Sequence, residues 1–341
     1  MPPKNRTTQY LTLPITTNTL PKRRQLFMPS RKPQTRPPHA PDLYIGPAGW
    51  SYPDWKRILY PDPRPKDFHE ASFLSEFFDT IEINTSFYHP MQPAHAEQWI
   101  DRVSANPRFL FTAKLWRKFT HEESTTATSD SDVEIVSVGL NVLQNAKRLG
   151  ALLLQFPFSF HHTPETMDRL KRLLDQFHSY PLVVEVRHAS WAKKEFYEFL
   201  HQRGVGFCNI DQPVIGRSIK PSERVTSPIG YIRLHGRRYD TWFTDDPASP
   251  PSERYNYLYS EAELEPWAER IEHVSESAGK TFVVTNNHFQ AKGIVNALQL
   301  MNLLTGEKIK IPEPLRSHYP ELEKIADAPA KEPTLFPLPP K

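Results

Sequence analysis

The sequence has little cysteine and no long apolar segment. Cys208 is the single cysteine among 341 residues, which excludes a disulfide scaffold, a thiolate zinc site and a Cys-ligated cluster. No apolar run approaches the roughly 20 residues that span a bilayer, and the N-terminus lacks a hydrophobic signal core. These absences predict an intracellular, cytoplasmic protein with no membrane partner.

Acidic residues are missing from the first 40 positions, and glycine is scarce throughout, with 12 glycines against 35 prolines. The first 40 residues carry eight basic side chains, so in a chain of net charge +3 the remainder carries −5. Residues 1–41 are rich in proline and threonine and are expected to be a disordered basic tail. Because the positive charge belongs to this tail, the body is not expected to bind a nucleic-acid backbone tightly.

Short motifs in the tail suggest targeting functions. Pro21–Arg24 can be read as a nuclear import signal, and Arg24–Phe27 as a short docking motif. The prolines oppose the amphipathic helix of a mitochondrial presequence. Four-residue matches also arise by chance in any basic tail. A second proline-rich tail, either a strap or a loose end, is expected over residues 311–341.

Between residues 42 and 310, strand patterns alternate with helical patterns, which is typical of a parallel sheet with crossover helices. The expected strands are Leu43–Ala48, Thr80–Asn84, Phe109–Lys114, Ala151–Gln155, Leu182–Arg187, Val205–Ile210, Gly230–His235 and Thr281–Asn286. The expected helices are Phe68–Phe78, Ala94–Val103, Val133–Leu149, Pro164–Phe177, Ser190–Gln202, Glu261–Ser277 and Ile294–Leu304. Only the crossover from Asp211 to Ile229 lacks a helical pattern.

Eight strand–helix units in about 265 residues match a (β/α)₈ TIM-like barrel. The alternative is a doubly wound open sheet, which would usually carry a glycine-rich phosphate turn after an early strand. The sequence has neither GxGxxG nor GxxxxGK. An α/β protein with one barrel domain over residues 42–310 is therefore favoured.

Polar residues alternate with apolar ones where the predicted strands end. In 81–84, Glu82 and Asn84 share one side of the strand and two isoleucines share the other. The same alternation gives the pairs Thr112 and Lys114, Glu185 and Arg187, Asn209 and Asp211, Arg233 and His235, and Asn286 and His288, while Gln155 ends the fourth strand. In a barrel the polar set would face the axis, at the end where barrel enzymes build their sites. Cys208 would then face the helices as a packed residue.

A barrel that needed only stability would fill these positions with apolar side chains, because a buried polar group without a partner costs about 1–3 kcal/mol. The repetition over successive strands therefore predicts a functional pocket. For individual residues the alternative is a self-satisfied ion network, for example between Glu185 and Arg187 or Arg233.

At these residues the chain resembles the YecE-like family of TIM barrels, known as domain of unknown function 72. The resemblance spans residues 43–306 and rests on Gly49–Tyr52, Trp55, Tyr60–Pro61, Phe78–Asn84, Phe87–Tyr88, Trp99, Phe109–Lys114, Thr120–His121, Leu152–Pro157, Val184–His188, Ser190–Trp191, Arg233–Gly236, Asn286–His288 and Asn296–Ala297. Two positions depart from the family pattern: Arg57 replaces a usual glycine and Gly293 a usual alanine. The resemblance implies the fold and the site, and the family has no established activity.

The residues favour an enzyme that acts on an anionic ligand, such as a phosphodiester or a sugar phosphate, by hydrolase-like or isomerase-like acid/base chemistry. The catalytic candidates are Glu82, Glu185, Asp211 and His235. The substrate-binding candidates are Trp50, Tyr52, Asn84, Tyr88, Lys114, Gln155, Arg187, Arg233, Asn286, Asn287 and His288.

Three other functions stay open. A metal could be held by Glu185, Asp211, His235 and His288. However, no HxH or HExxH element is present, and three cationic side chains would compete with a metal cation. No metal is therefore predicted, and the sequence does not identify a cofactor. A carboxylate-pair glycoside hydrolase suits the aromatic residues but not the arginines and lysine. A non-catalytic ligand-binding or adaptor barrel would use the basic tail for recruitment, and the tail could also hold a nucleic-acid fragment.

Overall fold

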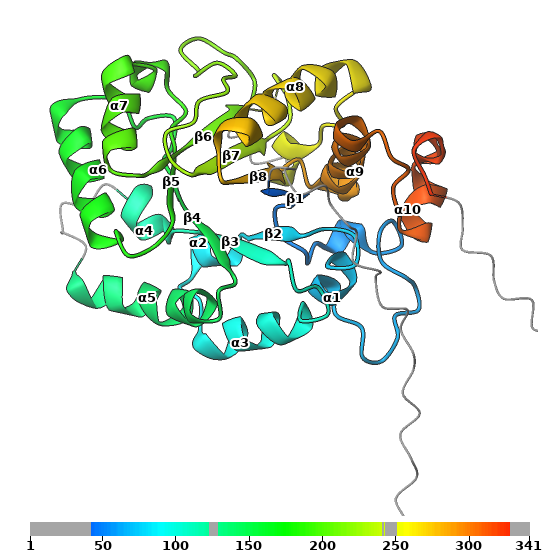
Figure 1. Ribbon diagram of the computed structural model, residues 1–341. Coiled ribbons are helices and arrows are strands. Elements are labelled where there is room, and N and C mark those ends of the chain that lie inside the picture. The colour runs from blue at the N-terminus through cyan, green and yellow to red at the C-terminus, as the bar shows by residue number, and fades with distance from the viewer. Residues whose placement is uncertain (1–41, 123–128, 241, 243–250, 328–341) are drawn as a thin grey trace, which may run out of the picture. The chain divides into compact units, whose positions relative to one another are not determined.

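Eight parallel strands form one sheet in the order β1-β8-β7-β6-β5-β4-β3-β2. The computed structural model describes residues 42–122, 129–240, 242 and 251–327; the predicted tail 1–41 and its motifs lie outside them. β1 and β2 close the sheet, because Ala48 pairs with Glu82 and the amide of Gly49 donates to the Glu82 carbonyl at 2.8 Å. Helices surround the strands (Figure 1). The chain is a (β/α)₈ barrel, as the sequence predicts.

Each predicted strand is present within two residues of its expected bounds. The strands are β1 Asp42–Pro47, β2 Thr80–Ile83, β3 Leu110–Lys114, β4 Leu149–Gln155, β5 Leu182–Glu185, β6 Gly206–Asp211, β7 Ile229–Leu234 and β8 Lys280–Thr285. Their residues are mostly β-branched or aliphatic and almost entirely buried, as expected of a parallel sheet that is covered on both faces.

The helices are α1 Glu70–Leu74, α2 Thr85–Tyr88, α3 Pro93–Arg102, α4 Arg117–Thr120, α5 Asp130–Asn145, α6 Pro164–Gln176, α7 Lys194–Gln202, α8 Glu261–Ser277, α9 Lys292–Thr305 and α10 Glu313–His318. The short 3₁₀ helices are η1 Pro53–Trp55, η2 Ala189–Trp191, η3 Pro251–Tyr255, η4 Phe289–Ala291 and η5 Pro320–Lys324. No helix among the described residues is both long and apolar enough to cross a membrane.

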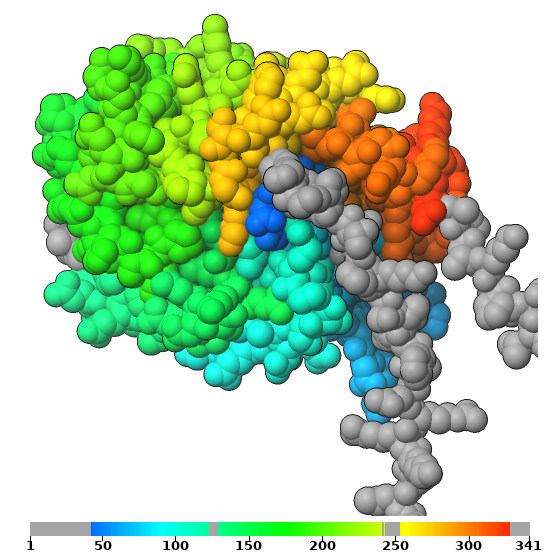
Figure 2. All heavy atoms as spheres, in the orientation of Figure 1, coloured from blue at the N-terminus to red at the C-terminus, as the bar shows by residue number. Residues whose placement is uncertain are grey.

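Three helix predictions are wrong in extent. The helix predicted over 133–149 is α5, which begins at Asp130 and ends at Asn145, and Leu149 starts β4. The segment predicted as one helix over 190–202 divides into η2 and α7, because Ala192 leaves the helical region of φ/ψ space. The helix predicted over 68–78 is the single turn α1. The crossover from β6 to β7 contains no helix, as predicted. In Figure 2 the atoms of the segments coloured green, yellow and orange lie directly against one another on the face in view.

The chain continues to pack beyond residue 310, where a tail is expected. Leu315 in α10 and Leu322 in η5 are fully buried. The backbone of Ile309 accepts a hydrogen bond from Asp327 and donates one to Ile325, both at 2.8 Å. The described part of this proline-rich segment is therefore a strap held on the barrel.

Arg57 has a backbone conformation that explains the glycine expected at this position. Its φ is 68°, in the left-handed region that costs about 1–2 kcal/mol for a residue with a Cβ atom. Its exposed side chain donates to Asp62 Oδ2 at 2.6 Å. This surface contact offsets little of the backbone cost.

Gly46 is required where β1 meets β2. A Cβ atom at Gly46 would lie 1.9 Å from the carbonyl oxygen of Thr80, which is a backbone atom that cannot rotate away. We expect Gly46→Ala to lower the free energy of unfolding by about 2 kcal/mol through overpacking. Urea unfolding measures the change. Gly279→Ala is the matched control, since its nearest contact would be an ordinary 3.4 Å; equal losses in the two variants would contradict the steric argument.

Candidate functional site

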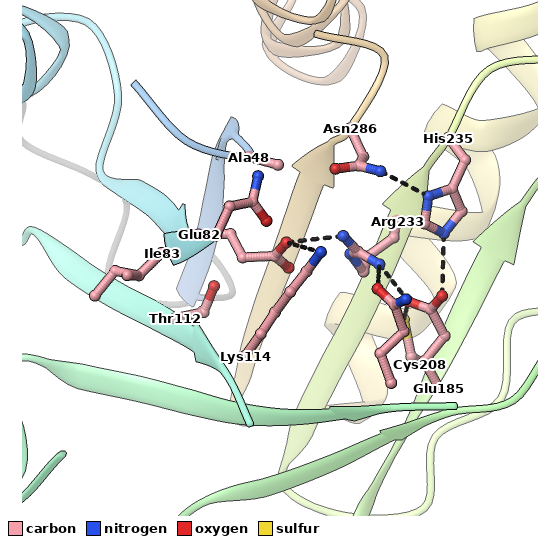
Figure 3. A network of polar contacts seen from close by, with 12 residues as sticks. Ala48, Glu82, Ile83, Thr112, Lys114, Glu185, Cys208, Arg233, His235 and Asn286 are labelled. Carbon is pink, nitrogen blue, oxygen red and sulfur yellow. Dashed lines mark hydrogen bonds and ion pairs between the residues drawn. The ribbon is translucent and has the colours of Figure 1, made fainter. Parts of the chain in front are cut away.

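Arg233 of β7 lies at the centre of a charged cluster inside the barrel (Figure 3). Its Nη2 lies 2.8 Å from Oε1 of Glu82 on β2, and its Nη1 lies 2.5 Å from Oε2 of Glu185 on β5. All three side chains have no exposed surface. Gln155 of β4 accepts a further hydrogen bond from Nη1 at 3.0 Å. One buried guanidinium therefore pairs with two carboxylates, one from β2 and one from β5.

The Glu82 side of the cluster carries two further contacts. The hydroxyl of Tyr231, also on β7, donates to Glu82 Oε2 at 3.0 Å and lies 2.9 Å from the Thr112 hydroxyl. Nζ of Lys114, at the end of β3, lies 3.7 Å from Glu82 Oε1. Glu82 is thus held more closely by Arg233 and Tyr231 than by Lys114.

The Glu185 side contains an arginine and a histidine. Nε and Nη2 of Arg187 lie 3.0 and 2.9 Å from Glu185 Oε1, and Nε2 of His235 lies 3.3 Å from the same oxygen. Burial alone would raise the pKa of Glu185, but Arg233, His235 and Arg187 hold it well below its usual range. Glu185 is therefore ionised near neutral pH and has no proton to donate.

His235 is neutral in this environment. Its ring is fully buried, and burial lowers its pKa to about 3 against the opposing attraction of Glu185. Asn286, which follows β8, donates to Nδ1 of the ring at 3.0 Å. This contact fixes the tautomer with hydrogen on Nε2, which faces Glu185.

Lys114 and Arg187 are the members of the cluster that reach solvent. Their side chains are 11% and 14% exposed, whereas those of Glu82, Glu185, Arg233 and His235 have no exposed surface. Burial and the nearby Arg233 lower the pKa of Lys114 to about 8. The name inner cluster is used below for six residues: Glu82, Lys114, Glu185, Arg187, Arg233 and His235.

Aromatic side chains flank the two exposed cations. The guanidinium of Arg187 lies 5.7 Å from the ring centre of Trp242, which also packs edge-on against His235 at 6.1 Å. Nζ of Lys114 lies 5.4 Å from the ring centre of Phe87. The place where Lys114 and Arg187 reach solvent is called the mouth of the barrel below. The two rings form apolar walls beside it.

Tyr52 organises a second group of polar atoms around η1. Its hydroxyl donates to the Ala48 carbonyl at 2.8 Å and accepts from Nδ2 of Asn84 at 3.0 Å, while its ring stacks on His288 at 4.3 Å. Oδ1 of Asn84 and Nδ1 of His288 are buried without a hydrogen-bond partner among the described residues. Burial lowers the pKa of His288 to about 4, so this ring is neutral as well.

Asp211 does not join the inner cluster, and this part of the prediction is wrong. Its carboxylate forms two hydrogen bonds with Arg237, at 2.8 and 3.1 Å, and accepts a third from the Tyr259 hydroxyl at 2.5 Å. Asn209 also faces outward, where Arg224 and Ser222 satisfy its amide.

The inverted face of β6 brings Cys208 inward. Its Sγ lies 3.8 Å from Glu185 Oε2, although the sequence predicts that it faces the helices. The crossover after β6 has no helix, and its backbone and hydroxyl groups are the partners of Asn209. Asn209 and Asp211 consequently lie outside the barrel together with Phe207, which packs on Phe196 and Tyr197 of α7, whereas Cys208 lies inside.

Three further predicted binding residues lie away from the inner cluster. Trp50 packs against Trp99 and Phe111 on the outer side of β3. Nδ2 of Asn287 donates to the Tyr257 carbonyl and to Asn296, each at 2.8 Å. Tyr88 is 57% exposed and contacts Phe87 edge-on.

Sequence reasoning did not single out Tyr231 or Trp242 as site residues. Tyr231 carries a readable signal, because it precedes Arg233 by two residues and so shares its face of the strand. Trp242 carries none, since its position over Arg187 depends on the path of the chain after β7. Within the described ranges, no three His, Cys, Asp or Glu side chains stand close enough to hold a metal ion.

The fold and the inner cluster define a TIM barrel with a charged site at the C-terminal ends of its strands. The family model described as "Protein of unknown function DUF72" matches residues 44–320. The chain belongs to this family.

Known relatives agree with this assignment. The UPF0759 protein YunF of Bacillus subtilis is 29% identical over 273 residues, which cover 77% of this chain and 94% of YunF. A solved DUF72 family protein from Thermotoga maritima is 31% identical, covers 77% of this chain and 99% of its own, and superposes with a TM-score of 0.66. A DUF72 protein from Enterococcus faecalis, 22% identical with a TM-score of 0.67, covers 77% of this chain and 95% of its own and supports the fold alone.

Proposed function

We propose that the barrel binds a small anionic ligand, such as a sugar phosphate or another phosphoester, at the mouth formed by Lys114 and Arg187. The observation that carries this proposal is the distribution of charge in the inner cluster. It contains three cationic side chains and two carboxylates, and His235 is neutral. Both carboxylates are fully buried, whereas two of the cations reach the mouth.

The hydrogen-bonding groups at the mouth suit such a ligand. Glu185 occupies only Nε and Nη2 of Arg187, so Nη1 of the guanidinium remains for a phosphate or carboxylate oxygen. The unpartnered Oδ1 of Asn84 and Nδ1 of His288 would accept hydrogen bonds from ligand hydroxyl groups. Trp242 and Phe87 would pack against the carbon skeleton.

The geometry gives less support to a carboxylate-pair glycoside hydrolase. Such an enzyme needs one carboxyl group that is protonated and one that is free to attack or to activate water. Here Glu82 and Glu185 are both buried against Arg233, and Glu185 is held ionised. Acid/base work in this site would fall to Lys114, whose pKa of about 8 lies near the working pH.

Calorimetry with a panel of sugar phosphates, inorganic phosphate and the matching uncharged sugars tests the proposal. We expect phosphorylated compounds to bind and uncharged ones not to bind. Arg187→Met should weaken binding about tenfold or more, because charge-assisted hydrogen bonds contribute about 1.5–3 kcal/mol. Lys114→Met should weaken it in the same direction.

Arg203→Met is the matched control, since Arg203 pairs with Asp175 on the outer surface. Equal affinities in Arg187→Met and Arg203→Met would contradict the proposed site, as would a panel without any anionic binder. If a phosphorylated compound binds but is recovered unchanged, the protein is a non-catalytic ligand-binding barrel that uses the same site.

A further inference from the structure

Lys114 is the cluster member whose charged group is least satisfied. Among the described residues its ion-pair partner is Glu82, and the 3.7 Å between Nζ and Oε1 exceeds a hydrogen-bond length. No hydrogen bond from Nζ is present in the part of the chain that the structure describes, and the centre of the apolar Phe87 ring lies 5.4 Å from it. A protonated amine carries three donors, so the charged form of Lys114 is less well satisfied here than in water and loses its proton more easily.

Two of the surrounding charges, those of Arg233 and Arg187, act in the same direction. Arg233 holds the nearest carboxylate oxygen at 2.8 Å, so the attraction of Glu82 for Lys114 is shared with a closer cation. Glu82 of β2 and Glu185 of β5 raise the pKa of Lys114, whereas burial, Arg233 of β7 and Arg187, which follows β5, lower it. Lys114 in turn acts on His121 after β3 and on His288 after β8, both of which are neutral with a pKa of about 4. Burial beside other cations is the arrangement that activates lysine as a nucleophile.

We propose that Lys114 forms an imine with the carbonyl group of an anionic ketone or aldehyde whose acidic group is held by Arg187. The inference rests on the proposed anion site and names its substrate class: a carbonyl compound with a phosphate or carboxylate. Lys114 and Arg187 are the two members of the inner cluster that reach the mouth, so one small ligand can meet both.

The step balances without an oxidant or reductant. The lone pair of the neutral Nζ attacks the carbonyl carbon; a C–N bond forms and the carbonyl π electrons move to oxygen. A proton passes from nitrogen to that oxygen, with Glu82 Oε1 as the nearest carboxylate relay. The carbinolamine then takes up a second proton at the oxygen and loses water, which leaves a protonated imine. Water reverses the sequence and restores the free amine.

Reductive trapping of the full chain tests the proposal. Dihydroxyacetone phosphate, pyruvate and the uncharged ketone acetone would each be incubated with the protein and sodium cyanoborohydride, followed by peptide mass mapping. We expect one secondary-amine adduct on Lys114, formed with the two anionic ketones at least about tenfold faster than on exposed Lys194, because the lower pKa leaves more neutral amine. Acetone should label Lys114 slowly.

Variants separate this proposal from the anion site. Lys114→Arg keeps the positive charge and removes the nucleophile, so it should bind phosphorylated ligands and form no adduct. Lys194→Arg should be trapped like the natural chain. Labelling of Lys114 no faster than of Lys194, or an equal adduct in Lys114→Arg, overturns the imine while anion binding still stands. If the natural chain binds none of the anionic compounds, the proposed function itself is wrong.

Discussion

Replacing Arg233 with methionine is expected to lower the free energy of unfolding by about 3–5 kcal/mol, the usual cost of removing one partner from a buried ion pair. The change leaves Glu82 and Glu185 without the guanidinium that lies 2.8 and 2.5 Å from their oxygens. Both carboxylates have no contact with solvent that could replace it. Urea unfolding, followed by fluorescence and circular dichroism, measures the loss.

Arg203→Met again provides the control, because this exposed arginine pairs with Asp175 and should contribute less than about 1 kcal/mol. A small effect of Arg233→Met would show that the two carboxylates are protonated or hydrated rather than paired. If the single variant does not fold, the triple variant Arg233→Met, Glu82→Gln, Glu185→Gln decides the matter. It removes both unpaired charges and should recover much of the lost stability.

Acidification from pH 7 to pH 4 is expected to remove about 3 kcal/mol of stability through His235 alone. The pKa of its buried ring is lowered to about 3 in the folded protein, against about 6.5 in an unfolded chain. Between these values only the unfolded chain binds the proton. The contribution of His235 is therefore complete above pH 6.5 and falls steadily as the pH decreases toward 3.

The variant His235→Gln isolates this effect, because its side chain does not titrate and can still donate to Glu185. Its overall stability will differ, but its loss between pH 7 and pH 4 should be smaller than that of the natural chain by about 3 kcal/mol. Parallel stability profiles for the two proteins would contradict a neutral, buried His235. Glu185 contributes in the same direction at lower pH: because its pKa is lowered in the folded protein, its stabilising effect begins to fall below about pH 4, near the pKa of an unfolded glutamate, and decreases further as the pH drops.

These predictions divide the inner cluster into two parts. Arg233, Glu82, Glu185 and His235 are completely buried, and their substitution should change stability first. Lys114 and Arg187 reach the mouth, and their substitution should change ligand affinity first. The buried part fixes the positions of the exposed part, because Glu185 orients Arg187 and Glu82 lies beside Lys114.

Much of the site could be predicted from single strands. Seven of the predicted residues follow the two-residue alternation of a strand and meet inside the barrel, as expected. They are Glu82, Lys114, Gln155, Glu185, Arg187, Arg233 and His235. Asp211 has the same alternation and lies outside. The difference lies in what covers the outer face of β6. The helix-free crossover after β6 supplies polar partners for Asn209, and Arg237 and the Tyr259 hydroxyl, from the segment after β7, supply them for Asp211.

The sequence by itself determined the eight strands, the barrel and the family, since these depend on local patterns of apolar residues and on short motifs. Only the tertiary structure decided that one arginine pairs with both carboxylates. Glu82 and Arg233 are 151 residues apart, and no local pattern specifies a contact over that distance. The tertiary structure also decided which cations reach the mouth, because their exposure depends on the rings of Phe87, in α2, and Trp242, which follows β7.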